Sequence, residues 1–225
     1  MSPVRVMTYN IWMGGRGGPA LDEVVRGSDA DVVLVNESPK TPFLWRSRAR
    51  GLAERWEMQY VAGGRDAGSN MIAAAPRVQV RSTFTTTIRQ PLFQPRRGIA
   101  AAQLRLHGRL LGVVSCHLSL DAERRAREVG QVIAVANRLR GPVLVGGDLN
   151  EIPGGPSWQR LRAAGYVDHG SRKWQTFPAD EPVKRIDALL VRGTPPVLHH
   201  GDPGVEEALQ RRASDHRAVL VELDL

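Results

Sequence analysis

Residues 142–150 read Pro142-Val143-Leu144-Val145-Gly146-Gly147-Asp148-Leu149-Asn150. An apolar run between a proline and a glycine pair predicts a buried strand that ends in a loop. Asp148 and Asn150 are two residues apart, so they face one side while the chain stays extended. A carboxylate beside a carboxamide suits the handling of a metal-bound water and of phosphate oxygens. Because Gly, Asp and Asn also favour ordinary turns, this stretch alone leaves a purely structural turn open.

Length and charge limit the interpretation of the rest of the chain. The 225 residues are enough for a substantial core, and no internal repeat divides them, so we predict a single domain over residues 1–225. The formal net charge is +8, the chain has three lysines, and arginine therefore supplies nearly all the positive charge. Such a balance favours phosphate-bearing partners, although scattered arginines are also typical of a general compositional habit.

Cysteine content and the amino terminus indicate the cellular setting. The lone Cys116 excludes an intramolecular disulfide framework and a cysteine-rich zinc site. Residues 1–10 are strand-like and lack the pattern of a signal peptide, and the chain has no apolar run of about 18 residues. We therefore expect a cytoplasmic monomer without stable membrane association, with export after removal of a leader left open.

Polar side chains also stand at the ends of other predicted strands. They are Asn10, Glu37, His117, Asp187, Asp215 and His216. Taken singly, Glu37 is typical of a loop carboxylate and His117 of a core histidine. If the strands lie side by side, however, their ends converge into one carboxylate-rich site with two histidines. Oxygen-rich ligation of this kind suits Mg²⁺ or Mn²⁺ better than Zn²⁺.

Three further segments have patterns that bear on the fold. The apolar spacing predicts a helix over residues 122–139, with Arg125 among the arginines on its solvated face. Residues 71–116 have the alternation and turn signals of an antiparallel meander. His199-His200 stands beside prolines and glycines, which favours an exposed loop.

In their order along the chain, these polar strand ends resemble the motifs of the endonuclease/exonuclease/phosphatase superfamily. That superfamily includes DNase I-like nucleases, abasic-site endonucleases, deadenylases, sphingomyelinases and inositol-phosphate phosphatases. The segments that carry the resemblance are Thr8-Tyr9-Asn10-Ile11, the strand ending in Glu37, Ser115-Cys116-His117-Leu118, Gly147-Asp148-Leu149-Asn150 with Pro153, Arg185-Ile186-Asp187 and Ser214-Asp215-His216. The resemblance implies an α/β fold, a DNase I-like four-layer α/β/β/α sandwich in which two mixed β-sheets pack face to face and helices flank them.

The resemblance also implies a divalent-metal site, for Mg²⁺ or Mn²⁺. Glu37 would be the principal metal ligand, with Asn10 and Asp215 close to the ion. Many members of the superfamily have Gln before this glutamate, whereas this chain has Asn36, which is one methylene shorter. The departure puts the support of the metal ligand in question.

Catalytic roles follow from the same resemblance. Asp148 would orient or deprotonate the attacking water, and Asn150 would hold the phosphate and the water in line. His117 would donate to a non-bridging phosphate oxygen as charge develops in the transition state. Asn70 is a further candidate contact to phosphate.

A histidine–carboxylate dyad completes the implied site. His216 would pair with Asp187 or Asp215, and the family resemblance favours Asp187. The carboxylate would fix the tautomer of His216 and raise its basicity, so that the imidazole acts as general base or as a cationic phosphate clamp. The sequence leaves open whether Asp148 or His216 is the base.

We therefore expect a divalent-metal-dependent phosphodiesterase that acts on DNA or RNA as an endo- or exonuclease. The alternative enzyme hydrolyses small phosphoesters or phospholipid head groups, in the manner of inositol phosphatases or sphingomyelinases. The chain shows no long insertions that would embrace duplex DNA or enter a bilayer, so a small or flexible phosphoester is the easier substrate to accommodate. A third hypothesis is a catalytically silent phosphate-binding domain.

Overall fold

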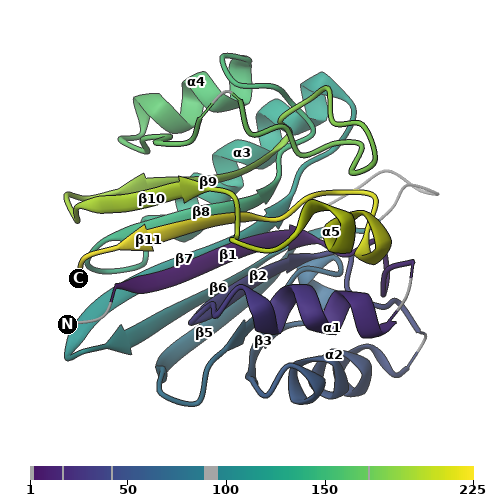
Figure 1. Ribbon diagram of the computed structural model, residues 1–225. Helices are drawn as coiled ribbons and strands as arrows, with labels where there is room; N and C mark the ends of the chain where they lie inside the picture. The colour runs from purple at the N-terminus through teal and green to yellow at the C-terminus, as the bar shows by residue number, and fades with distance from the viewer. Residues whose placement is uncertain (1–2, 17, 42, 89–95, 172) are drawn as a thin grey trace.

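Two β-sheets packed face to face form the centre of the protein, and helices cover their outer faces (Figure 1). The computed structural model describes residues 3–16, 18–41, 43–88, 96–171 and 173–225. The first sheet contains β1 (Val4–Asn10), β2 (Val32–Asn36), β3 (Gln59–Gly63), β4 (Met71–Ala74), β10 (Val197–Gly201) and β11 (Val219–Leu223). The second contains β5 (Gln79–Ile88), β6 (Arg97–Leu106), β7 (Arg109–His117), β8 (Val143–Asp148) and β9 (Asp187–Arg192).

Five α-helices lie outside the sheets within the described residues. They are α1 (Gly18–Gly27), α2 (Trp45–Arg55), α3 (Ala122–Ala136), α4 (Pro156–Ala163) and α5 (Glu207–Ala213), and a short 3-10 helix, η1 (Arg65–Ala67), precedes β4. The first, second and fifth pack on the first sheet, and α3 and α4 pack on the second (Figure 1). This arrangement confirms the predicted four-layer α/β/β/α sandwich.

Three apolar layers hold the sandwich together. The central layer lies between the sheets and includes Leu34, Ile72, Val113 and Leu144, all with no exposed surface. The outer layers lie beneath the helices and include Leu52 on one side. Strands such as β2 have an apolar layer on both faces, which explains their unbroken runs of Val and Leu.

Strand register brings the polar strand ends to one edge. In the first sheet β1 and β2 run parallel, with Asn10 opposite Asn36. In the second sheet β7 and β8 run parallel with His117 opposite Asp148, and antiparallel β9 places Asp187 opposite Asp148. Parallel strands end at the same edge, and an antiparallel neighbour begins there.

The edge strands of the first sheet differ from the expectations. β3 pairs antiparallel with β4 and was not predicted, because its short sequence lacks a clear alternation. His199 and His200 lie in β10, which pairs with β11, so the predicted loop is wrong. An edge strand is half-solvated and tolerates polar residues, which removes the alternation that would have identified it.

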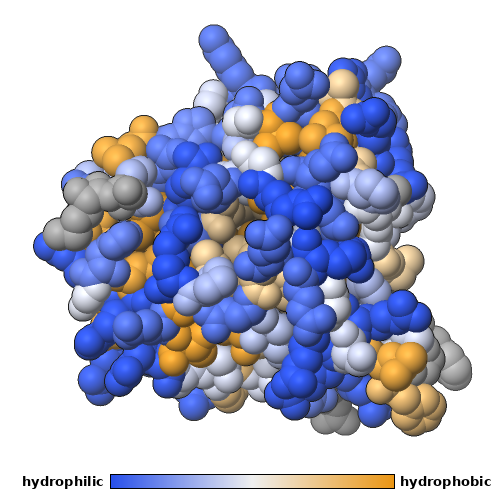
Figure 2. All heavy atoms as spheres, turned by 60° about the horizontal axis from the view of Figure 1, so that its bottom comes forward, coloured by the Kyte–Doolittle hydropathy of each residue, from blue (hydrophilic) through white to orange (hydrophobic). Residues whose placement is uncertain are grey.

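The face that carries α1 and α2 is mainly hydrophilic, with hydrophobic side chains in small separate groups (Figure 2). No helix in the described residues combines the length and apolar character needed to span a bilayer.

The glycine pair at the end of β8 is required by close packing. Gly147 has φ of +146°, and a Cβ there would collide with the carbonyl oxygen of Cys116 on β7. Gly146 lies between the sheets, where a Cβ would be 2.6 Å from Leu189 Cδ2 and 2.8 Å from Leu34 Cδ1. The space beside Gly146 is therefore filled by Leu189 of the same sheet and Leu34 of the other, which leaves no room for a side chain.

Replacing Gly147 by Ala is expected to lower the free energy of unfolding by about 2 kcal/mol or more, because both the backbone conformation and the contact with Cys116 are unfavourable for a side chain. Gly51→Ala in α2 is the matched control, since a Cβ there meets open space and Ala favours helices by about 1 kcal/mol. Urea unfolding measures both variants. Equal stability of the two variants would contradict the packing argument.

Candidate active site

The six polar strand ends predicted from the sequence come together at one edge of the sandwich. Asn10 ends β1, His117 ends β7, Asp148 ends β8 and Asp187 begins β9. His216 lies just before β11, whose Val219 pairs with Thr8 near the end of β1; Glu37 and Asp215 lie beside them. The site thus draws on both sheets.

Asp148 is held by a network that reaches across the two sheets. Its Oδ1 accepts a hydrogen bond from the Asn150 backbone amide at 2.9 Å, and its Oδ2 accepts one from Asn10 Nδ2 at 3.2 Å. The carboxyl is 98% buried. Burial first, and the neighbouring charge of Asp187 second, raise the pKa of Asp148 to about 7, although His216 and the hydrogen bonds oppose this rise. The group is therefore able to exchange a proton near neutral pH.

His216 forms a close pair with Asp187. Its Nδ1 lies 2.8 Å from Asp187 Oδ2, so the partner that the sequence left open is Asp187. Burial alone lowers the pKa of His216, but the charge and hydrogen bond of Asp187, with Asp148 and Asp215 nearby, raise it to about 9. Its Nε2 lies 3.9 Å from Asp148 Oδ2, so a cationic ring nitrogen faces the carboxyl that exchanges protons.

His117, unlike His216, is neutral. Burial, and then the charge of Arg97, hold the pKa of this imidazole well below its ordinary value, so the ring is neutral. Its Nε2 lies 3.1 Å from Asn150 Nδ2 and 3.3 Å from Asp148 Oδ2. Its Nδ1 is buried, has no hydrogen-bond partner among the described residues and lies 3.9 Å from Glu37 Oε1. The ring thus keeps hydrogen-bonding capacity for a ligand.

The predicted metal ligands lie at the more open side of the site. Glu37 has φ of +56° and a side chain that is 24% exposed, and Asp215 is half-buried. Asn10 Oδ1 accepts the backbone amide of Trp12 at 3.1 Å. Two accessible carboxylates beside an amide oxygen form a donor set that suits a hard divalent cation. These residues therefore fit the metal implied by the resemblance.

A second group of possible metal ligands lies deeper. Asp148, Asp187 and His216 each offer a ligand atom within 4.8 Å of the others. The Nδ1 of His216 and the Oδ2 of Asp187 are already joined by a hydrogen bond, which a cation between them would have to break. The open carboxylates Glu37 and Asp215 are therefore the better candidates.

Asn36 supports the catalytic loop rather than the glutamate that follows it. Its Oδ1 accepts the Asp148 backbone amide at 2.8 Å, and its Nδ2 donates to Asn70 Oδ1 at 2.8 Å and to the Cys116 carbonyl at 2.9 Å. Asn70 is fully buried and donates to the Gly98 carbonyl at 2.7 Å. Both amides thus brace the site, and the contact of Asn70 to phosphate stays a prediction.

One group beside the catalytic residues, Thr176, was missed in the sequence, and Phe177 lies next to it. Thr176 Oγ1 accepts the backbone amides of Ile186 at 3.1 Å and Asp187 at 3.2 Å, which fixes the start of β9. The ring of Phe177 lies 4.7 Å from that of His216. Both come from an irregular segment, where no periodic pattern marks a residue as important.

Arg125 is also different from the prediction. It is 91% buried instead of solvated, and its Nε donates to Glu151 Oε1 at 3.1 Å. Glu151 directly follows Asn150 and also accepts the Ser157 backbone amide at 2.6 Å. The arginine therefore anchors the loop that carries Asn150, a contact across 26 residues that helical spacing alone does not reveal.

Comparison with known proteins supports the same interpretation. The model of the endonuclease/exonuclease/phosphatase family matches residues 7–216. The chain belongs to this family. Its membership and the site together indicate a phosphoester hydrolase, in a family whose enzymes generally depend on a divalent metal. No curated protein sequence matches the chain.

Solved structures share the fold at low sequence identity. An endonuclease/exonuclease/phosphatase from Bacteroides vulgatus has a TM-score of 0.77 at 16% identity, over 100% of both chains. A mannosyl-6-phosphatase from Bacteroides thetaiotaomicron has a TM-score of 0.76 at 17% identity, over 99% of this chain and 100% of that one. A humanized TDP2 from D. rerio has a TM-score of 0.72 at 19% identity, over 100% of both.

The raised pKa of Asp148 has a consequence for stability. Because the folded state holds this proton more tightly than the unfolded state, ionisation destabilises the fold as pH rises from about 4 through about 7. In EDTA, Asp148→Asn is therefore expected to be more stable than the wild type at pH 8 by roughly 1–3 kcal/mol, with the difference vanishing below pH 4. Urea unfolding at several pH values measures it. A stability difference that does not change with pH would show that burial of the charge is not the cause.

Proposed function

We propose that this protein is a divalent-metal-dependent phosphodiesterase that cleaves nucleic acid. The observation that carries the proposal is the convergence of Asp148 with two histidines, because Asp148 Oδ2 lies 3.3 Å from His117 Nε2 and 3.9 Å from His216 Nε2, whose Nδ1 is 2.8 Å from Asp187. The excess of positive charge, +8, favours a polyanionic substrate over a small phosphoester with few charges.

Glu37, Asn10 and Asp215 would hold the metal ion. A bound Mg²⁺ or Mn²⁺ supplies charge neutralisation at the phosphoryl oxygens. Asn10 and Glu37 lie at strand ends of the first sheet and His117 at a strand end of the second, while Asp215 and His216 are adjacent residues just before β11.

The other site residues would transfer the proton and bind the phosphate. Asp148 is the favoured general base, because its pKa of about 7 matches neutral conditions. His216, with its pKa raised to about 9, is protonated at that pH and acts as the cationic clamp. Asn150 orients the water and phosphate, and the neutral ring of His117 donates to a non-bridging oxygen.

A second candidate function is hydrolysis of small phosphoesters. One of the solved structures with this fold is a mannosyl-6-phosphatase, and this chain matches it over 99% of its length. The two functions make different predictions about salt, because displacement of counterions from a polyanion depends strongly on ionic strength.

Asp148→Ala and His216→Ala are each expected to lower kcat for phosphodiester hydrolysis by about 10²–10⁴-fold, because each removes a proton-transferring or charge-stabilising group. Steady-state hydrolysis in Mg²⁺ measures the loss, and near-native circular dichroism checks the fold. The same variants control for contaminating nucleases. Full activity of both variants would exclude the mechanism.

The substrate class is tested with single-stranded DNA, RNA, an abasic duplex and a panel of small phosphoesters, each in Mg²⁺, Mn²⁺ or EDTA. We expect metal-dependent cleavage of nucleic acid. For single strands, the logarithm of the binding constant should fall linearly with log[salt], with a slope of about −0.7 per neutralised phosphate. Activity confined to small phosphoesters, with little dependence on salt, would establish the second candidate instead.

A further inference from the structure

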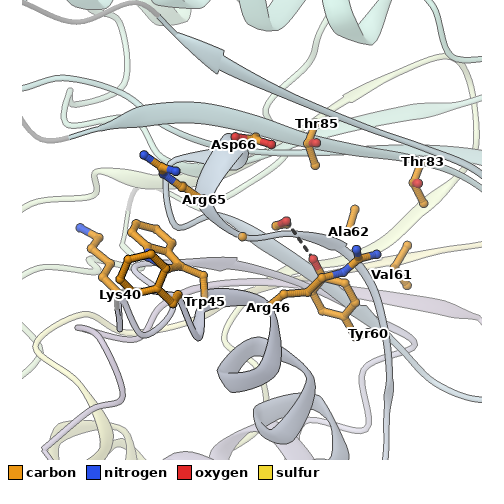
Figure 3. A pocket seen from close by; sticks show the side chains of 13 residues that line it. Lys40, Trp45, Arg46, Tyr60, Val61, Ala62, Arg65, Asp66, Thr83 and Thr85 are labelled. Atoms are coloured by element: carbon orange, nitrogen blue, oxygen red, sulfur yellow. Dashed lines mark hydrogen bonds between the residues drawn. The ribbon is translucent and has the colours of Figure 1, made fainter.

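A cavity lies beside the catalytic residues and contains none of them. Its volume is about 610 Å³, which is in the range of pockets that bind small organic groups. It lies between the segment after β2, the strand β3 and the strand β5 (Figure 3). The residues that give it its character are Lys40, Phe43, Trp45, Arg46, Tyr60 and Arg65.

The lining combines aromatic rings with positive charge. It has three aromatic and three cationic side chains against the single carboxylate of Asp66. In Figure 3, Trp45 lies with Lys40 and Arg65 toward one end of the cavity, and Tyr60 lies with Arg46 toward the other. Rings that stack on bases and cations that bind phosphates are the combination by which proteins hold single-stranded nucleic acid.

Phe43 and Trp45 lie outside the core clusters, whereas Tyr60 is half-buried and packs against the core beneath α2. Phe43 is fully exposed and has φ of +62°, a conformation that is rare for a bulky residue. Trp45 is half-buried at the first position of α2, and the hydroxyl of Tyr60 donates to the Gly63 carbonyl at 2.8 Å, which holds its ring at the wall. Exposed rings at the rim of a cavity favour a binding role over packing.

Backbone contacts join this cavity to the catalytic edge. Ser38, the neighbour of Glu37, donates from its backbone amide at 2.9 Å and from Oγ at 2.8 Å to the carbonyl of Ser69. The Gly64 amide, in the wall of the cavity, donates to the Asn70 carbonyl at 3.3 Å.

We propose that this cavity binds an unpaired nucleotide next to the scissile phosphate, its base against Trp45 or Tyr60 and its flanking phosphate at the cationic rim. The inference rests on the proposed nuclease function and names its preferred substrate, a single strand or a flexible end. In a duplex the bases are already paired and stacked, so entry of one base into the cavity would require its extrusion at an energetic cost.

The test compares one nucleic-acid substrate with one that is too small to reach the cavity. Trp45→Ala and Arg65→Ala are expected to raise KM for an eight-residue thymidine oligonucleotide about ten-fold, because base stacking and phosphate binding are lost. Hydrolysis of bis(p-nitrophenyl) phosphate, which occupies only the catalytic centre, stays unchanged. Trp45→Phe retains a stacking face and restores most of the affinity.

Arg109→Ala is the matched control for charge, because Arg109 is exposed and lies at the opposite end of β7 from His117. Binding is also measured without cleavage, by anisotropy of a labelled oligonucleotide with Asp148→Asn as the background. Cavity variants that behave like Arg109→Ala, while the wild type cleaves the oligonucleotide, overturn the inference and leave the nuclease function intact.

Two other experimental outcomes would show whether the proposed function or only this inference is wrong. Hydrolysis of small phosphoesters with neither binding nor cleavage of any oligonucleotide overturns the proposed function and this inference together. Binding to phosphatidylserine vesicles that is lost in Trp45→Ala, with oligonucleotide binding unaffected, assigns the aromatic rim to a membrane surface and overturns the inference alone.

Discussion

One buried amide joins the two sheets at the edge where the catalytic residues meet. Asn36 ends β2 in the first sheet, yet its side chain contacts the backbone of Asp148 on β8 and of Cys116 on β7 in the second. A Cβ on Gly147 would lie 3.1 Å from Asn36 Oδ1, so the short amide and the glycine fit each other. Loss of these contacts would leave buried polar groups without partners, which costs more than a typical hydrogen bond contributes.

The short side chain at position 36 is therefore compatible with the family's site. The departure from Gln raised the question of whether the metal-binding glutamate keeps its support. In this chain the amide braces Asn70 and the strand that delivers Asp148, while Glu37, with φ of +56°, follows it at the more open side of the site. The backbone amide of Asp148 and the Oδ1 of Asn70 each lie 2.8 Å from the Asn36 side chain, so an amide that is one methylene shorter reaches both.

Much of this architecture was predictable because short stretches of sequence indicate where strands begin and end. Apolar runs that stop at Asn10, Glu37, His117 and Asp148 mark buried strands and their ends, and parallel pairing then brings those ends together. What the sequence did not show depends on contacts between distant segments. Arg125 looked solvated because helical spacing describes only one element, whereas its partner Glu151 lies on a loop 26 residues away.

Edge strands and irregular segments were not predicted because their local sequence patterns are weak. β3 and β10 lie at the edges of the first sheet, where solvent replaces one neighbour and weakens the alternation of apolar and polar residues. Thr176 acts through its hydroxyl on the backbone of β9, and a single threonine in an irregular segment gives no signal of that contact. Its importance is apparent only when the chain is folded.

Charge is distributed in the site so that neighbouring groups take different protonation states. Asp187 supports the cation on His216 by a direct hydrogen bond, and the same carboxylate disfavours a second negative charge on Asp148. His117 stays neutral, because burial first and the charge of Arg97 second lower the pKa of its imidazole. Strand register sets His117 and Asp187 opposite Asp148 in the second sheet, and the segment before β11 brings His216 onto Asp187, so the division between base, cation and neutral donor follows from the fold itself.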